Sequence, residues 1–356
     1  MLYGILLLII FLSFFSRIEK GRYNKQLFTL AVIALIIFCW LRDPFLYPDI
    51  GNYYDFFTGY TNGMEDNFGL GYTVLNTVSR SFTSSFYVFM LIVAIIIISS
   101  YAKIIKDYSP YIWLSLLLYL LINYYPSFFL LRQYIAMSVF LFSIKYVINR
   151  NPWKFGILSL IAISFHLTAV VILPFYFLYG IKFSKMNMLW LLLGSVLAIL
   201  MFMRLSDIIG LVSAYYMGYF ESEMDSPAWQ RALMKIYIMV VYLFAMRQSF
   251  YDKGINRVVF YCMLLNVIIC VAAMNMYGVF RMREFFSLAD YIGIPIIIQQ
   301  VTQRKVTMRP LFYSMVLVYI VLLFMSFNNF VTGENMNNQY QFYWEGTEYR
   351  MANTSK

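Results

Sequence analysis

Three polar side chains stand near the ends of long apolar runs, where they could bind an anion or move a proton. Arg132 and Gln133 follow the turn 123–127, and His166 is the single histidine of the chain. An ionisable side chain at membrane depth is costly, so it indicates a function unless it snorkels to the interface, as Arg132 could. One imidazole cannot form a multi-histidine metal site, which leaves proton transfer, hydrogen bonding or a structural role for His166.

A second group of cations, Arg281 and Arg283, stands at the start of the apolar run 282–300. Planar guanidinium groups bind phosphate oxygens through two hydrogen bonds at once, and the amino end of a helix favours an anion. We therefore predict that these arginines bind phosphate. The alternative is internal pairing with Glu284 or Asp290.

Polar residues also follow the second apolar run, where Arg42, Asp49, Asn52 and Tyr53 stand close together in the sequence. Asp49 and Asn52 would also suit the cap of a short helix. No Asp-x-Asp pair occurs in this loop, so a divalent-metal site of the kind used by many glycosyltransferases is not indicated. Phosphate-binding loops, dinucleotide fingerprints, serine-hydrolase elbows and zinc signatures are also absent from the sequence, and we expect neither a metal nor a cofactor.

The elements that must position these side chains are membrane helices. The chain is 62% hydrophobic and 12% charged, whereas globular proteins are about 25% charged. Its apolar runs are roughly 15 to 20 residues long, which suits a hydrocarbon core about 30 Å thick. We predict an all-α, polytopic transmembrane bundle that forms a single integral membrane domain over residues 1–356. About twelve crossings are expected from these runs: 1–15, 27–41, 86–102, 110–124, 127–147, 153–167, 168–183, 187–204, 229–247, 256–277, 282–300 and 309–328.

The placement of charges predicts the orientation of this bundle. The formal net charge of +10 would suit a nucleic-acid partner, but six short segments contain 17 of the 27 Lys and Arg residues and 3 of the 17 acids. These segments are 17–25, 103–107, 145–154, 182–185, 247–257 and 304–309. Basic residues near helix ends stay on the cytoplasmic side, so the asymmetry explains the high charge without nucleic acid. Both termini, the loops 42–85 and 204–228 and the tail 329–356 are then outside.

The region 153–183 allows two interpretations. One long crossing over 156–179 would place Lys182 and Lys185 outside and invert every later loop. Two short segments that meet near His166 and Leu167 keep both lysines inside. We therefore favour a helix pair or re-entrant hairpin with His166 at its outer tip.

Taken in order, these polar residues resemble the EpsG family of bacterial exopolysaccharide proteins, which are Wzy-type polysaccharide polymerases. The resemblance implies a polymerase that joins repeat units carried on undecaprenyl pyrophosphate, at the outer face of the bacterial cytoplasmic (inner) membrane. A bundle of the glycosyltransferase-C type would be in keeping with it. The expected partners are the lipid-linked oligosaccharide, the bilayer and a chain-length regulator protein. The matching pieces are Arg42, Asp49-x-x-Asn52-Tyr53, Leu131-Arg132-Gln133-Tyr134-Ile135-Ala136, Phe165-His166-Leu167-Thr168-Ala169 and Phe280-Arg281.

The resemblance also assigns roles to these residues. Arginines would stabilise the charge that grows on the leaving pyrophosphate, and a base would take the proton of the attacking hydroxyl. The pyrophosphate-binding set is then Arg132, Arg281, Arg283 and Arg42, the base is His166 or Asp49, and the supporting set is Gln133, Asn52, Tyr53 and Glu284.

The sequence also allows two other functions. A lipid-linked glycan ligase, or another membrane glycosyl- or acyltransferase, would use the same outer site and differ only in its acceptor. A transporter or flippase would instead need ionisable groups spread through the middle of the bundle.

Overall fold

The computed structural model describes residues 2–18, 24–47, 49–59, 68–181, 185–203, 228–245, 254–272, 281–303, 306–332 and 342–344. Within these residues the protein is helical and has no strand, which confirms the all-α prediction. Five segments are long and apolar enough to cross a membrane. They are Phe86–Tyr108, Leu131–Ile148, Ile255–Ala272, Arg283–Thr302 and Arg309–Asn329. Twelve crossings and a glycosyltransferase-C arrangement stay predictions.

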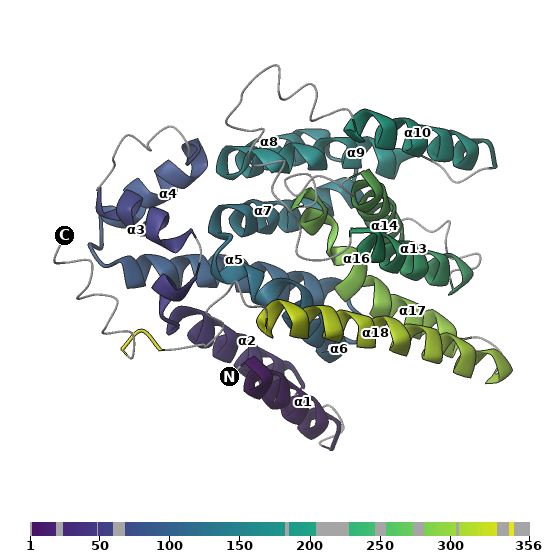
Figure 1. Cartoon of the computed structure of the whole chain (residues 1–356), viewed down its shortest axis with the longest axis horizontal. Helices are drawn as coiled ribbons and strands as arrows, with labels where there is room; N and C mark the ends of the chain where they lie inside the picture. The colour runs from purple at the N-terminus through teal and green to yellow at the C-terminus, as the bar shows by residue number, and fades with distance from the viewer. Residues whose placement is uncertain are drawn as a thin grey trace.

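The first part of the chain forms one side of the bundle. Helix α5 packs between α2 and α7, and α1 lies against α2 and α6 (Figure 1). These helices are apolar on nearly every face, as expected where one side meets protein and the other lipid. The elements are α1 (Leu2–Ile18), α2 (Asn24–Trp40), α5 (Phe86–Tyr108), α6 (Ile112–Tyr119) and α7 (Leu131–Ile148).

Two short helices, α3 (Ile50–Thr58) and α4 (Leu70–Arg80), lie together at one end of the bundle, on the left of Figure 1. Aromatic rings join them, since the Tyr53 and Tyr72 ring centroids are 5.4 Å apart. Helix α4 also packs against the end of α8. The end of α2, the start of α5 and these two helices therefore share one end of the molecule.

A close backbone approach brings α4 onto α8. Gly69 has φ +79°, and a Cβ there would lie 2.7 Å from the carbonyl oxygen of Ser164. A Cβ on Gly71 would lie 2.5 Å from Ser164 Oγ and 2.9 Å from the Phe165 ring. Only glycine fits both positions without displacing α8.

The region after Asn151 forms a helical hairpin. Asn151 caps α8 (Pro152–Phe165) by accepting a hydrogen bond from the Lys154 N–H at 3.1 Å. The helix stops at His166, whose φ of −153° and ψ of 122° are extended. The chain continues as a 3-10 helix, Leu167–Ile172, and α9, Leu173–Gly180, and both pack back against α8. The expected break at His166 is therefore confirmed.

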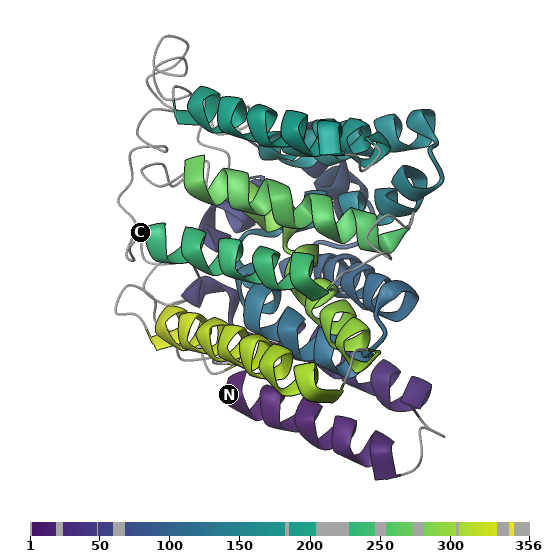
Figure 2. The same cartoon turned by 90° about the vertical axis from the view of Figure 1, so that its right-hand side faces the viewer.

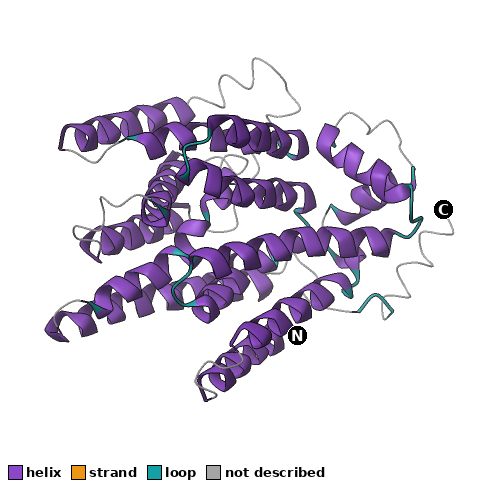
Figure 3. Cartoon of the chain, turned by 180° about the vertical axis from the view of Figure 1, so that it is seen from behind, coloured by secondary structure: helices purple, strands orange, loops and turns teal. Residues whose placement is uncertain are grey.

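The remaining helices complete the bundle. Helix α14 contacts α10, α13 and α16, while α18 contacts α13 and α17. Figure 2 shows α10, α14, α13 and α18 as successive layers, and Figure 3 shows the same bundle from behind. The elements are α10 (Lys185–Met203), α13 (Ala228–Ala245), α14 (Ile255–Ala272), the 3-10 turn Arg283–Phe286, α16 (Leu288–Tyr291), α17 (Gly293–Thr302), the 3-10 turn Val306–Met308 and α18 (Arg309–Thr332).

Two predicted outer segments fall mostly outside the described residues. The loop 204–228 is described only at Ala228, and the tail 329–356 only at 329–332 and 342–344. The second of these short stretches lies at the end of α2, where the Tyr343 N–H donates to the Leu41 carbonyl at 3.0 Å.

Candidate functional site

Arg132 is the second residue of α7 and faces two aromatic side chains. Its guanidinium carbon lies 5.1 Å from the centre of the Phe68 ring and 6.0 Å from that of Tyr53. Burial raises the pKa of Tyr53, while the charge of Arg132 and a side-chain hydrogen bond to it oppose the rise. The cation is thus held at the junction of α7 with α3 and α4, where aromatic faces stabilise it.

His166 lies in the joint of the hairpin, outside both of its apolar helices. Its Nδ1 is 2.6 Å from the Thr168 hydroxyl and accepts a 3.3 Å hydrogen bond from the Thr168 N–H. Burial, together with the charges of Arg132 and Arg281, lowers the pKa of the imidazole to about 3. The ring is therefore neutral at physiological pH and shares a neighbourhood with two cations from other elements.

Arg281 joins this group through its backbone. The Gln133 side-chain amide donates to the Arg281 carbonyl oxygen at 2.9 Å. Gln133 is buried and stands next to Arg132 on α7, so one side chain links the two arginines. The structure thus brings together Arg132, Gln133, His166 and Arg281, which come from three separate parts of the sequence.

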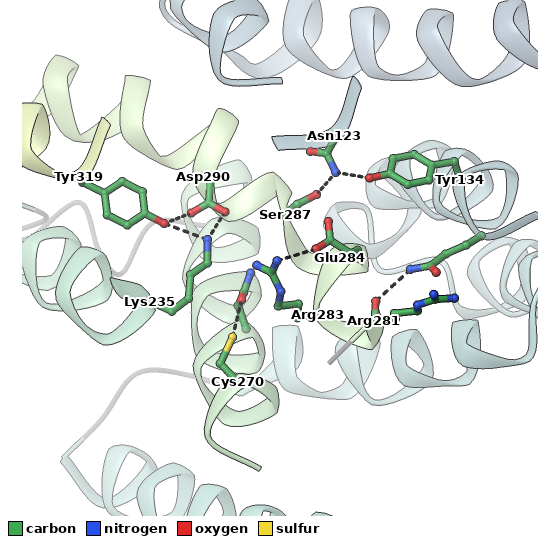
Figure 4. Close-up of polar contacts among 12 residues, drawn as sticks. Asn123, Tyr134, Lys235, Cys270, Arg281, Arg283, Glu284, Ser287, Asp290 and Tyr319 are labelled. Atoms are coloured by element: carbon green, nitrogen blue, oxygen red, sulfur yellow. Dashed lines mark hydrogen bonds and ion pairs between the residues drawn. The ribbon is translucent and has the colours of Figure 1, made fainter. Parts of the chain in front are cut away.

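Arg283 and Glu284 follow Arg281 along the same segment (Figure 4). The Arg283 guanidinium pairs with the Glu284 carboxylate at 2.9 Å, and both side chains are largely buried. This is the internal pairing that the sequence left open as the alternative to phosphate binding.

Arg42 is held by other contacts. It is 1% exposed, and its guanidinium donates to the carbonyl oxygens of Cys39 and, at 2.6 Å, Phe128. The Phe128 ring centre is 4.6 Å away. These contacts tie the end of α2 to the turn before α7, so Arg42 has an evident structural role. Its predicted role in binding pyrophosphate stays a prediction.

Asp49 and Asn52 lie at the start of α3, and both are exposed. Asp49 occupies the N-cap position with φ 64°, but its side chain makes no capping hydrogen bond. Its charge acts on Tyr53, the tyrosine beside Arg132. Asp49 therefore lies on the same side of α3 as the Arg132 site, with its carboxylate available to solvent.

The sequence did not predict a group of buried polar side chains from other helices that contact Ser287 and Asp290, further along the segment that contains Arg281 (Figure 4). Lys235 of α13, Asp290 of α16 and Tyr319 of α18 form three mutual hydrogen bonds of 2.6 to 2.9 Å. Nearby, Asn123 donates to Ser287 at 3.0 Å and to the Tyr134 hydroxyl at 3.3 Å. The available signal was Lys235 itself, an ionisable residue in the middle of the apolar run 229–247.

Metal-ligating side chains do not cluster in the part of the chain that the structure describes. No group of three His, Cys, Asp or Glu residues there is arranged to hold a metal ion. The groups where Arg132, Gln133, His166 and Arg281 come together are guanidinium, imidazole and amide groups, with the Thr168 hydroxyl beside the imidazole. Such groups can bind an anion and accept a proton.

A family model described as the EpsG family matches residues 44–343, which is most of the chain. The match includes every predicted site residue except Arg42. No curated protein and no solved structure matches the chain.

Proposed function

The chain belongs to the EpsG family of Wzy-type polysaccharide polymerases, and from this premise we propose which lipid-linked substrate it uses and where. We propose that it transfers a growing glycan from undecaprenyl pyrophosphate onto a lipid-linked repeat unit. The reaction would take place at the outer face of the cytoplasmic membrane. Multi-pass apolar helices and membership of this family support a membrane site for the reaction.

The proximity of Arg132, His166 and Arg281 supports this proposal most directly. They come from α7, from the joint of the α8–α9 hairpin and from the segment before α16, and the charges of both arginines act on the imidazole. Two cations beside one neutral imidazole suit an anionic leaving group and a proton acceptor. A pyrophosphate linkage supplies the first requirement, and an attacking hydroxyl supplies the second.

In the proposed reaction, the bond between the anomeric carbon and the pyrophosphate oxygen breaks as the acceptor hydroxyl oxygen bonds to that carbon. The electron pair leaves with undecaprenyl pyrophosphate, and the hydroxyl proton passes to His166 or Asp49. Arg132 and Arg281 stabilise the charge that grows on the leaving oxygen, without a metal ion. Arg283 and Arg42 complete the pyrophosphate-binding set, and Gln133, Asn52, Tyr53 and Glu284 support the sugar side of the site.

The test uses purified full-length protein in lipid nanodiscs with a synthetic undecaprenyl-pyrophosphate-linked repeat unit. The expected product is a ladder of multiples of the repeat unit, equally abundant with and without a chelator. A single addition would favour a ligase, and loss of the ladder in chelator would reject metal-independent chemistry. The variants Arg132→Ala and Arg281→Ala should each lower the rate by about a hundredfold or more, as for other removed transition-state charges. Normal ladders from either variant would remove that residue from the mechanism.

A further inference from the structure

The network of Lys235, Asp290 and Tyr319 is closed and buried. The Lys235 ammonium donates to Asp290 Oδ2 at 2.6 Å and to the Tyr319 hydroxyl at 2.9 Å. That hydroxyl in turn donates to Asp290 Oδ1 at 2.6 Å. The side chains of Lys235 and Asp290 are 6% and 1% exposed. Three separate helices, α13, α16 and α18, are thereby tied at one point of the bundle.

The winding of the segment before α17 places Asp290 in a row of polar side chains. Ser287 N–H bonds to the Glu284 carbonyl at 3.1 Å, and Asp290 N–H bonds to the Ser287 carbonyl at 2.9 Å. In such a 3-10 arrangement the side chains three residues apart lie directly above one another. Glu284, Ser287 and Asp290 therefore form one row, which runs from the 3-10 turn Arg283–Phe286 into the short helix α16.

Each member of this row is held by a different partner. Glu284 pairs with Arg283, Ser287 accepts from Asn123 of the α6–α7 connection, and Asp290 binds Lys235. Hydrogen bonds of 3-10 type have poorer geometry than those of an α-helix, so this winding needs support from outside. The side-chain bonds supply that support.

Stability alone does not account for the ion pair. A buried salt bridge often contributes no more than apolar side chains of the same volume would, but it fixes the relative position of its partners. We propose that Lys235, Asp290 and Tyr319 are positioning residues that fix the rotation of segment 281–291, so that Arg281 faces His166 and the leaving group. This inference rests on the proposed function of Arg281.

The test replaces the whole network by apolar side chains, because removing one partner would leave a buried charge. The triple variant Lys235→Met, Asp290→Leu, Tyr319→Phe is expected to keep its melting temperature. Its hydrogen exchange should be faster than that of the wild type in peptides covering 281–291 and unchanged elsewhere. In the ladder assay we expect kcat to fall by about tenfold while KM for the lipid-linked unit changes less than about threefold, since the loss concerns the transition state.

A matched control exists on the same pair of helices. The Tyr237 hydroxyl of α13 donates to the Met315 carbonyl of α18 at 2.9 Å. Tyr237→Phe removes this link between α13 and α18 but not the network, so its exchange and kcat should equal those of the wild type.

The outcomes separate this inference from the function on which it rests. Wild-type kcat and wild-type exchange in the triple variant, with an inactive Arg281→Ala, would overturn the positioning role alone. A fully active Arg281→Ala would overturn the proposed function of Arg281 and the positioning role with it. If the triple variant does not fold, the single variant Tyr319→Phe decides, because it keeps the ion pair and removes two of the three hydrogen bonds. Unchanged exchange over 281–291 in that variant would reject the inference.

Discussion

The Gln133 side-chain amide donates a 2.9 Å hydrogen bond to the carbonyl oxygen of Arg281, across 148 positions of the sequence. Gln133 is adjacent to Arg132, so this bond couples the first turn of α7 to the backbone that carries the second cation. Its donor is 1% exposed, and a buried hydrogen bond without competition from water gives a well-defined geometry. The spacing of the two arginines therefore depends on one neutral side chain.

Replacing Gln133 tests this dependence. Gln133→Met keeps the length and volume of the side chain but removes the donor, and it leaves the Arg281 carbonyl without this bond. We expect polymerisation to slow by about tenfold, which corresponds to roughly 1.4 kcal/mol, the size of one buried hydrogen bond. The measurement is the initial rate of ladder formation. Gln303→Met, at an exposed position of the chain, is the control, and equal rates in the two variants would contradict the coupling.

Arg132 should not be replaceable by lysine. Lysine keeps the positive charge but lacks the planar fork that binds two phosphate oxygens and stacks on the Phe68 ring. We expect Arg132→Lys to retain only a small part of the activity, with a rate within about tenfold of that of Arg132→Ala. Lys103→Ala, which removes an exposed cation paired with Asp107 at 2.8 Å, controls for the loss of charge and should polymerise normally. Wild-type rates from Arg132→Lys would show that a point charge suffices.

The break at His166 could be predicted from the placement of charges. Residues 156–179 could form one long crossing, but Lys182 and Lys185 would then lie outside and every later loop would be inverted. Charge placement is a property of the sequence and needs no tertiary contact. The same reasoning placed Arg132 and Arg281 at helix ends.

The 3-10 row and its partners could not be predicted in this way. The spacing of Glu284, Ser287 and Asp290 also suits neighbouring positions on one α-helix, so nothing in the sequence indicates the tighter 3-10 turn at Arg283–Phe286. Lys235 stood in an apolar run without a visible partner, because Asp290 and Tyr319 are far away in the sequence. The prediction that Arg42 binds pyrophosphate stays open, but no sequence pattern reveals that its guanidinium donates to the carbonyl groups of Cys39 and Phe128.

Close packing of α4 on α8 should be essential beside His166. In Gly71→Ala the new methyl group would meet Ser164 and the Phe165 ring at distances no real Cβ tolerates, so α4 or the end of α8 must shift. We expect the ladder rate to fall by about tenfold and the melting temperature to drop, since overpacking typically costs about 1 to 3 kcal/mol. Gly51→Ala in α3 is the matched control, because nothing lies within 4 Å of its added Cβ. A wild-type rate in Gly71→Ala would mean that the position of α4 does not affect the site.

The single histidine should make the protein sensitive to acid. The pKa of His166 is lowered from its ordinary 6.5 to about 3 by burial and by the charges of Arg132 and Arg281. Between these values the unfolded chain binds a proton that the folded protein does not, so the free energy of unfolding falls as the pH drops below about 6.5. The stabilisation is fully present above that pH. Because the ring is partly exposed, we expect a loss of about 1 kcal/mol between pH 7.5 and pH 5, less than full burial would give.

The measurement compares melting temperatures of the wild type and His166→Gln in detergent at pH 7.5 and pH 5. Both proteins contain the same carboxylates, so their acid titration cancels in the comparison, and His166→Gln should lose less stability than the wild type. The neutral imidazole that produces this difference is also the form that can accept the proton of an acceptor hydroxyl. Equal losses in both proteins would mean that the folded imidazole takes up a proton as readily as the unfolded one. His166 would then be charged at pH 5 and would repel the two arginines rather than serve as their neutral neighbour.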